Sequence, residues 1–290
     1  MSPLRRSSTQ RAVAGLLAHV RYEVFPTPSI YDTVLSGVPR EVTITVTTSP
    51  RKGLEPTLAL AEKLSAVGYR VVPHLSARLL RDKGEVRAVA ERLQSAGVVE
   101  VFVPAGDAGV PAGAFQGALE VLVELSNLPS RFERVGITGY PERHPQISDD
   151  VTIQSMWDKR HYADYIVSNL CFHPGTLVAW VRRVRARGVT LPLYLGFAGP
   201  NDPAKLVEMA RKIGVSDSAR FAGSHLRFIA RLSASPGGYE PDRLLNRVAP
   251  ALSDEALFVA GLHVFTFNQV DRAETWRRAH LERPQIDVAH

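Results

Sequence analysis

The chain of 290 residues contains a single cysteine, Cys171. One thiol cannot form an intramolecular disulfide, and it cannot supply a cysteine-based zinc site, so both are excluded. A reducing, cytoplasmic compartment is therefore favoured. Cys171 stands in an apolar run, where a buried structural thiol is commoner than a catalytic nucleophile, and the sequence alone leaves both interpretations open.

Long apolar runs, metal-ligand spacing and a serine-nucleophile motif are also missing. No run approaches the roughly 20 apolar residues of a membrane span, and the apolar stretch 12–18 is short for a signal peptide, so no membrane partner is expected. No His/Asp/Glu set has metal-ligand spacing, so we predict no metal site. No Gly-x-Ser-x-Gly motif is present, which argues against serine-type acyl transfer.

Acidic residues are fewer than basic ones: the chain has 29 Asp and Glu and 35 Lys and Arg, for a net charge of +6. This excess suits an acidic ligand, either nucleic acid or a polyanionic small molecule. The densest basic run, residues 182–187, has helical spacing and no interleaved aromatic residues for base stacking. We interpret it as a solvated helix face, and we expect no nucleic-acid partner.

Short β-rich runs alternate with segments of helical period along the chain. The predicted strands are residues 20–25, 42–48, 70–74, 98–104, 134–139, 165–170, 192–197 and 263–267, and the predicted helices are 56–67, 85–96, 115–125, 152–161, 175–187 and 203–213. Eight such units predict an α/β protein with a (β/α)8 TIM barrel fold. The long interval 214–262 predicts extra helices between strands 7 and 8.

We expect one catalytic domain over residues 1–290, with flexible tails at 1–10 and 284–290. A doubly wound sheet is the alternative, but no Gly-x-Gly-x-x-Gly follows the first predicted strand.

A barrel of this kind carries its chemistry at the carboxyl ends of its strands. Polar candidates and glycines stand at or near these ends: Glu23, Thr45, His74, Gly106, Asp107, Tyr140, Glu142, His144, Asn169, Asn268 and Arg272. Glu23 lies between apolar neighbours, where a carboxylate is costly to bury unless it is paired or protonated. A surface or ion-paired glutamate is the alternative interpretation.

Several segments, in this order, resemble the catalytic barrel of the methylenetetrahydrofolate reductase family over nearly the whole chain. They are residues 22–26, 42–47, 73–75, 106–107, 140–145, 163–170, 267–268 and 271–274. The Tyr-Pro-Glu-Arg-His-Pro block at 140–145 and the Ala-Asp-Tyr-Ile-Val run at 163–167 are the most specific of them.

The resemblance implies NAD(P)H-dependent reduction of 5,10-methylenetetrahydrofolate to 5-methyltetrahydrofolate, in one-carbon metabolism and methionine biosynthesis. It implies that Glu23 is the general acid that opens the five-membered ring and that Asp107 stabilises the resulting iminium. The implied substrate-binding residues are Asn169, Phe267, Asn268 and Arg272. Asn169 stands where the family usually has a glutamine, and the positive charge suits a polyglutamylated folate.

Most of the family holds FAD on the same rim. The residues that match its cofactor-binding positions are Thr45, His74, Gly106, Tyr140, His144 and Lys159. The family's arginine before Gly-Asp is Ala105 here, which removes a cation and a bidentate donor near the flavin. We therefore expect weak or absent FAD binding, with hydride passing directly from NADH or NADPH.

Three alternatives stay open at this stage. They are FAD-dependent catalysis of the same reaction, a non-catalytic folate-binding or regulatory barrel, and a deazaflavin-dependent reductase of another one-carbon carrier.

Overall fold

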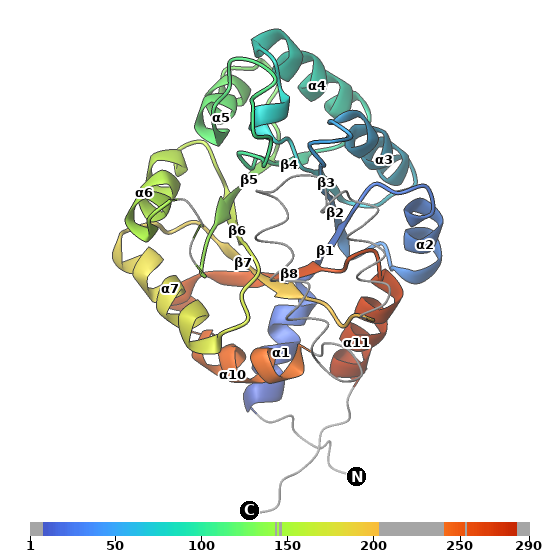
Figure 1. Cartoon of the computed structure of the whole chain (residues 1–290). Helices are drawn as coiled ribbons and strands as arrows, with labels where there is room; N and C mark the ends of the chain where they lie inside the picture. Colours follow the sequence, from blue (N-terminus) through green and yellow to red (C-terminus); the bar gives the residue numbers. More distant parts are fainter. Residues whose placement is uncertain (1–7, 143, 145–146, 203–240, 253, 283–290) are drawn as a thin grey trace, which may run out of the picture.

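The computed structural model describes residues 8–142, 144, 147–202, 241–252 and 254–282. Eight parallel strands form one sheet in the order β3-β2-β1-β8-β7-β6-β5-β4, which confirms the predicted α/β (β/α)8 barrel (Figure 1). The strands are β1 (Arg21–Val24), β2 (Thr43–Val46), β3 (Val71–Pro73), β4 (Glu100–Phe102), β5 (Arg134–Gly139), β6 (Tyr165–Ser168), β7 (Leu193–Ala198) and β8 (Val259–Phe265).

Helices surround the strands as an outer ring, in which α1 lies between α10 and α11 and packs against β8 (Figure 1). The α-helices are α1 (Ser8–Ala18), α2 (Ile30–Gly37), α3 (Glu55–Ala66), α4 (Lys83–Ser95), α5 (Ala118–Ser126), α6 (Asp149–Lys159), α7 (Pro174–Ala186), α10 (Asp242–Leu252) and α11 (Val270–Glu282). Two short 3-10 helices, η1 (Ala77–Leu79) and η2 (Glu255–Leu257), complete the described elements. Of these helices, not one combines the length and apolar character that a membrane crossing requires.

The predicted strands all coincide with observed strands, although β8 begins four residues before the predicted start at 263. Helices α2 and α11 were not predicted, and residues 8–10, which we expected in a flexible tail, form the first turn of α1. Between β7 and β8 the described part of the chain holds α10 and η2. The predicted helix 203–213 lies outside the described residues.

The two faces of β1 have different surroundings because successive side chains of a strand point to opposite sides. Tyr22 and Val24 are fully buried in the apolar layer between strands and helices. The Tyr22 hydroxyl donates to Glu274 of α11 at 2.9 Å. Arg21 and Glu23 therefore point into the barrel interior.

A buried ion pair fills the amino-terminal end of the barrel. Arg21 Nη1 donates to Oε1 of Glu100 at 2.5 Å, and Glu100 is fully buried. The Arg21 guanidinium also lies 4.3 Å and 3.9 Å from the ring centres of Tyr165 and Tyr194. Burial alone would raise the pKa of Glu100, but the charges and hydrogen bonds of its arginine partners outweigh burial and lower it.

The barrel closes between β3 and β4 through an isolated parallel bridge between His74 and Phe102. The amide of Leu75 donates to the Phe102 carbonyl at 2.8 Å, and the rings of His74 and Phe102 lie 4.7 Å apart. His74 is therefore held at the closing seam, at the carboxyl end of β3.

The basic run 182–187, at the carboxyl end of α7, makes several contacts within the fold. Arg183 and Arg187 lie 3.3 Å and 2.7 Å from Asp149 and Asp150. Arg185 donates to the Leu257, Phe258 and Val189 carbonyls. Three arginines of this run thus bind α6 and the segment before β8.

Gly196 of β7 is expected to be indispensable for barrel packing. A Cβ at this position would lie 2.2 Å from the carbonyl oxygen of Ser168 on β6, so alanine would force the two strands apart. We expect Gly196→Ala to cost about 2 kcal/mol and to lower Tm by several degrees. Gly15, inside α1 with nothing within 4 Å of an added Cβ, is the control. Gly15→Ala should stabilise by about 0.5–1 kcal/mol, and a Gly196→Ala protein with an unchanged Tm in thermal denaturation would contradict the packing argument.

Candidate active site

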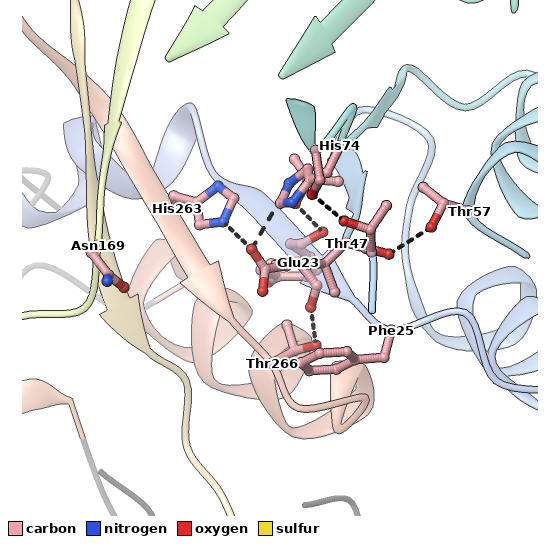
Figure 2. Close-up of polar contacts among 12 residues, drawn as sticks. Glu23, Phe25, Thr47, Thr57, His74, Asn169, His263 and Thr266 are labelled. Carbon is pink, nitrogen blue, oxygen red and sulfur yellow. Dashed lines mark hydrogen bonds and ion pairs between the residues drawn. The ribbon is translucent and has the colours of Figure 1, made fainter. Parts of the chain in front are cut away.

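Glu23 lies on β1 with its carboxyl inside the barrel near the carboxyl ends of the strands, and its side chain is 9% exposed. Nε2 of His263, on the neighbouring β8, lies 3.0 Å from Oε2 of Glu23. Nε2 of His74, directly after β3, lies 3.9 Å from the same oxygen (Figure 2). Three strands thus bring one carboxyl and two imidazoles together.

This environment differs from the expected one in one respect. The sequence predicts apolar neighbours around the carboxyl, but one of these residues, Tyr22, faces α11, on the opposite side of β1. The alternation of side chains along a strand is the reason, since direct neighbours in sequence cannot share a face. Two groups that do contact the carboxyl come from β8 and from the end of β3.

Both histidines are neutral at neutral pH. Burial lowers the pKa of His74 to about 4, with a smaller opposing effect of the Glu23 charge. Burial lowers the pKa of His263 to about 3, and the positive charge of Arg21 lowers it further. Neither imidazole therefore supplies a positive charge to the Glu23 carboxyl.

Residues after β8 fix the backbone around Glu23. Thr266 Oγ1 donates to the Glu23 carbonyl at 2.6 Å (Figure 2). The Asn268 side chain accepts from the Phe25 amide at 2.7 Å and donates to the Phe25 carbonyl and to Thr27 Oγ1 at 2.9 Å and 3.0 Å. Asn268, which we predicted to bind substrate, thus uses its amide to hold the loop after β1.

A second group of predicted residues gathers after β4 and β5. The rings of Tyr140 and His144 meet edge to face at 5.0 Å. Burial raises the pKa of Tyr140 to about 12, and the nearby Asp107 carboxylate adds to the shift. Burial lowers the pKa of His144, and Asp107 opposes this change. Asp107 itself is exposed, and its charge acts on both Tyr140 and His144.

Gly106, directly before Asp107, has a φ of +89°, and a Cβ on it would lie 2.9 Å from Cβ of Ser76. A glycine is required at this position because other side chains are strained at such φ and would collide with Ser76. The backbone conformation directly before Asp107 therefore depends on this glycine.

The remaining predicted substrate contacts follow β6 and β8 or lie on α11. Asn169 is exposed after β6, with its side-chain oxygen accepting from the Leu170 amide at 2.8 Å. Arg272 is partly exposed on α11, 3.7 Å from Asp202 after β7. Phe267 is half-buried with a φ of +50°.

Two predicted cofactor residues are engaged within the fold. Thr45 of β2 is buried, and its hydroxyl donates weakly to the Tyr22 carbonyl at 3.4 Å. Lys159, at the end of α6, donates to Ser155 at 2.6 Å, and burial lowers its pKa.

The loop after β4 fits a flavin dinucleotide poorly. Residues 104–117 contain no lysine or arginine, and Ala105 stands at the family's arginine position. Arg78 reaches this loop, but it donates to the Ala108, Gly109 and Gln116 carbonyls at 2.7–3.2 Å. Those contacts hold the loop backbone, and they use donors that a pyrophosphate would need.

Two polar residues acquire roles that the sequence did not suggest. His263 was assigned only to a strand, although the adjacency of strands 1 and 8 in a closed barrel could have placed it beside Glu23. Glu142, expected on the rim, accepts from the Phe172 and His173 amides at 2.6 Å and 3.1 Å and so holds the start of α7. Cys171 is buried, which supports its structural interpretation.

Residues 31–218, well over half of the chain, match the family model described as methylenetetrahydrofolate reductase. The chain belongs to this family. A curated relative, methylenetetrahydrofolate reductase 2 of Saccharomyces cerevisiae, is 24% identical over 165 residues, which cover 54% of this chain and 26% of the yeast protein. The chain thus aligns with about a quarter of that reductase.

The barrel itself is common to other enzymes. A crystal structure of a proposed phosphonomutase from Burkholderia cenocepacia J2315 superposes with a TM-score of 0.50 at 9% identity, covering 94% of this chain and 98% of that one. A likeness at this identity shows the fold alone.

The match to the family model, residues 31–218, contains Asp107, Tyr140 and His144. It does not contain Glu23 or His263. The structure joins the two regions, because β1 lies between β2 and β8 in the sheet.

The two neutral histidines predict a loss of stability in acid. The unfolded chain binds a proton at each histidine near pH 6.5, whereas folded His263 stays neutral until about pH 3. The unfolded state therefore binds more protons between these pH values, and stability falls as the pH falls. From pH 7.5 to 5.0, urea denaturation should show wild type losing roughly 2 kcal/mol more than His263→Gln.

The control is His161→Gln, because His161 is exposed. It should keep the wild-type dependence of stability on pH. Equal acid losses in wild type and His263→Gln would contradict the assignment of a neutral, buried His263.

Proposed function

We propose that the protein reduces 5,10-methylenetetrahydrofolate to 5-methyltetrahydrofolate, with NADH or NADPH giving its hydride directly to the folate. Membership of the reductase family supports the reaction class. The observation that carries the proposal is the Glu23 carboxyl, almost fully buried inside the barrel and flanked by two neutral imidazoles. A carboxyl in low-dielectric surroundings is suited to hold and release a proton.

The reaction needs a proton before it needs a hydride. In the product the one-carbon unit stays on N5, so N10 is the nitrogen that leaves the methylene carbon. Glu23 donates a proton to N10 as the C–N10 bond breaks, which leaves an N5 iminium cation. Hydride from C4 of the nicotinamide then adds to the methylene carbon, giving the N5-methyl group and oxidised nicotinamide. Glu23 regains its proton from solvent.

Asp107 is suited to stabilise the cation that this ring opening creates. It is exposed at the carboxyl end of the barrel, directly after Gly106, whose backbone has a φ of +89°. A carboxylate held by a preorganised turn lowers the energy of a nearby developing positive charge. Asn169 is also exposed on this rim and can bind the pterin edge.

The acidic end of the folate calls for cations. Arg272 at the start of α11 is partly exposed and only loosely paired with Asp202, at 3.7 Å. A guanidinium with this exposure can bind a carboxylate of the glutamate tail. The net charge of +6 supports a polyglutamylated substrate.

Direct hydride transfer is supported by the loop after β4. Ala105 provides no cation, and Arg78 is engaged with backbone carbonyls. The iminium is a strong electrophile, so a nicotinamide needs no flavin as intermediary once the ring has opened. In this proposal NADH or NADPH is a substrate that donates the hydride.

The proposal is tested by measuring NADH and NADPH oxidation by the pure protein with methylenetetrahydrofolate, together with its visible absorption spectrum. We expect oxidation without added FAD and no flavin band. A stoichiometric flavin chromophore, or activity that requires FAD, would reject direct transfer and leave the flavin-dependent reaction. Folate binding without any nucleotide oxidation would indicate a binding or regulatory barrel.

Removing the acid should stop turnover and spare binding. Glu23→Gln keeps the size of the side chain but cannot donate a carboxylic proton, so we expect kcat to fall at least about 100-fold while folate affinity stays close to wild type. Folate affinity is measured by titration calorimetry. Glu274→Gln, which alters another buried glutamate on α11, is the control and should keep kcat at temperatures where it is folded. Wild-type-like turnover of Glu23→Gln would remove Glu23 from the mechanism.

A further inference from the structure

We propose that His263 is a positioning residue for Glu23: its Nε2–H donates a hydrogen bond to Oε2 and thereby places the transferable proton on Oε1. This inference rests on the proposed function, in which Glu23 is the general acid. It concerns the neighbouring strand β8, outside the residues that match the reductase family model.

The geometry fixes both partners. The distance from Nε2 of His263 to Oε2 of Glu23 is 3.0 Å, and His263 is 1% exposed. The imidazole also meets the ring of Phe265 edge to face, with ring centres 4.8 Å apart. The side chain is therefore confined to an orientation that points Nε2 at the carboxyl (Figure 2).

His74 does not compete for this role. Its Nε2 lies 3.9 Å from Oε2 of Glu23, beyond hydrogen-bond distance. Arg21, the charged neighbour on the same face of β1, donates to Glu100 at the other end of the barrel. Of these three groups, His263 is the one within hydrogen-bond distance of the Glu23 carboxyl.

The other ring nitrogen identifies the tautomer. A neutral imidazole has one N–H and one bare nitrogen. Within the described part of the chain, Nδ1 of His263 is buried without a hydrogen-bond partner. Unpaired buried N–H groups are rare, so the hydrogen belongs on Nε2, where an acceptor is present. Burial, which lowers the pKa of His263 to about 3, keeps the ring in this neutral form.

The hydrogen bond has two effects on the acid. With Oε2 accepting from His263, the carboxylic proton of Glu23 is carried by Oε1. When that proton leaves, the bond becomes charge-assisted and stronger, so it stabilises the carboxylate that forms. An interaction that grows during proton transfer raises kcat and leaves substrate binding nearly unchanged.

The tautomer is tested first, by NMR of protein labelled with ¹⁵N-histidine at neutral pH. The His263 signals are assigned by their loss in His263→Gln. The ¹⁵N shifts of the two ring nitrogens distinguish a protonated from a bare nitrogen, and we expect the hydrogen on Nε2. A hydrogen on Nδ1, or a doubly protonated ring, would overturn the proposal. This measurement needs no turnover, so it decides the tautomer even if the proposed reaction fails.

The kinetic test compares two substitutions of the same residue. Glutamine offers an N–H near the position of Nε2, whereas leucine offers none. We expect His263→Leu to lower kcat about 10- to 100-fold with little change in KM for methylenetetrahydrofolate, and His263→Gln to recover most of the loss.

His280→Leu is the matched control, because it removes another buried histidine whose Nε2 lies 2.9 Å from a carboxylate, Asp242. It should lower Tm but keep kcat. Equal kcat losses in His263→Gln and His263→Leu, or a change in KM alone, would reduce His263 to a packing residue. A wild-type protein without nucleotide oxidation would instead refute the proposed function.

Discussion

Strand β1 points two ionisable side chains of opposite type into one barrel, and the interior is arranged around that constraint. Arg21 and Glu23 are two residues apart on the same face, but they do not pair in the described structure: Arg21 donates across the barrel to Glu100. A buried guanidinium left without this partner would cost about 3–5 kcal/mol. With Arg21 committed below, the carboxyl of Glu23 meets the neutral rings of His263 and His74 above. Because Arg21 is paired with Glu100 at the amino-terminal end of the barrel, the Glu23 carboxyl can be buried beside two neutral histidines.

The closure of the barrel and the presentation of Asp107 depend on the same hydrogen bonds. Strands β3 and β4 share an isolated bridge, so the segments that follow them complete the seam. The amides of Ala77 and Arg78 donate to the carbonyls of Pro104 and Ala105 at 3.0 Å and 2.9 Å. These bonds run from η1 to the residues directly before Gly-Asp. The segment that carries Asp107 is therefore positioned by the loop after β3. A change in η1 would alter the position of Asp107.

The sequence predicted the barrel well because each strand is a local signal: a β-rich run, often following a glycine that ends a helix. It also placed Glu23 on the correct strand. What it could not supply was the set of neighbours, since these depend on register and closure. His263 contacts Glu23 only because β8 pairs with β1, 240 residues apart in sequence. Tyr22 was misjudged as a neighbour because adjacency in sequence was given more weight than the alternation of faces. Asn268 bonds a loop that only the closed barrel brings near.

The proposed proton donor, Glu23, and the loop after β4 belong to different parts of the barrel, so the proposed acid can persist while the cofactor-binding residues change. The acid and its histidines lie on β1, β8 and the end of β3, whereas the position of the family's flavin-side arginine is Ala105, after β4. Arg78 keeps a guanidinium near that loop, yet its donors hold carbonyls and thereby fix the backbone. In the proposed reaction, ring opening by Glu23 precedes hydride transfer, so the ring-opening step is the same whether a flavin or a nicotinamide delivers the hydride. Loss of the arginine therefore weakens the case for a bound flavin without weakening the case for catalysis.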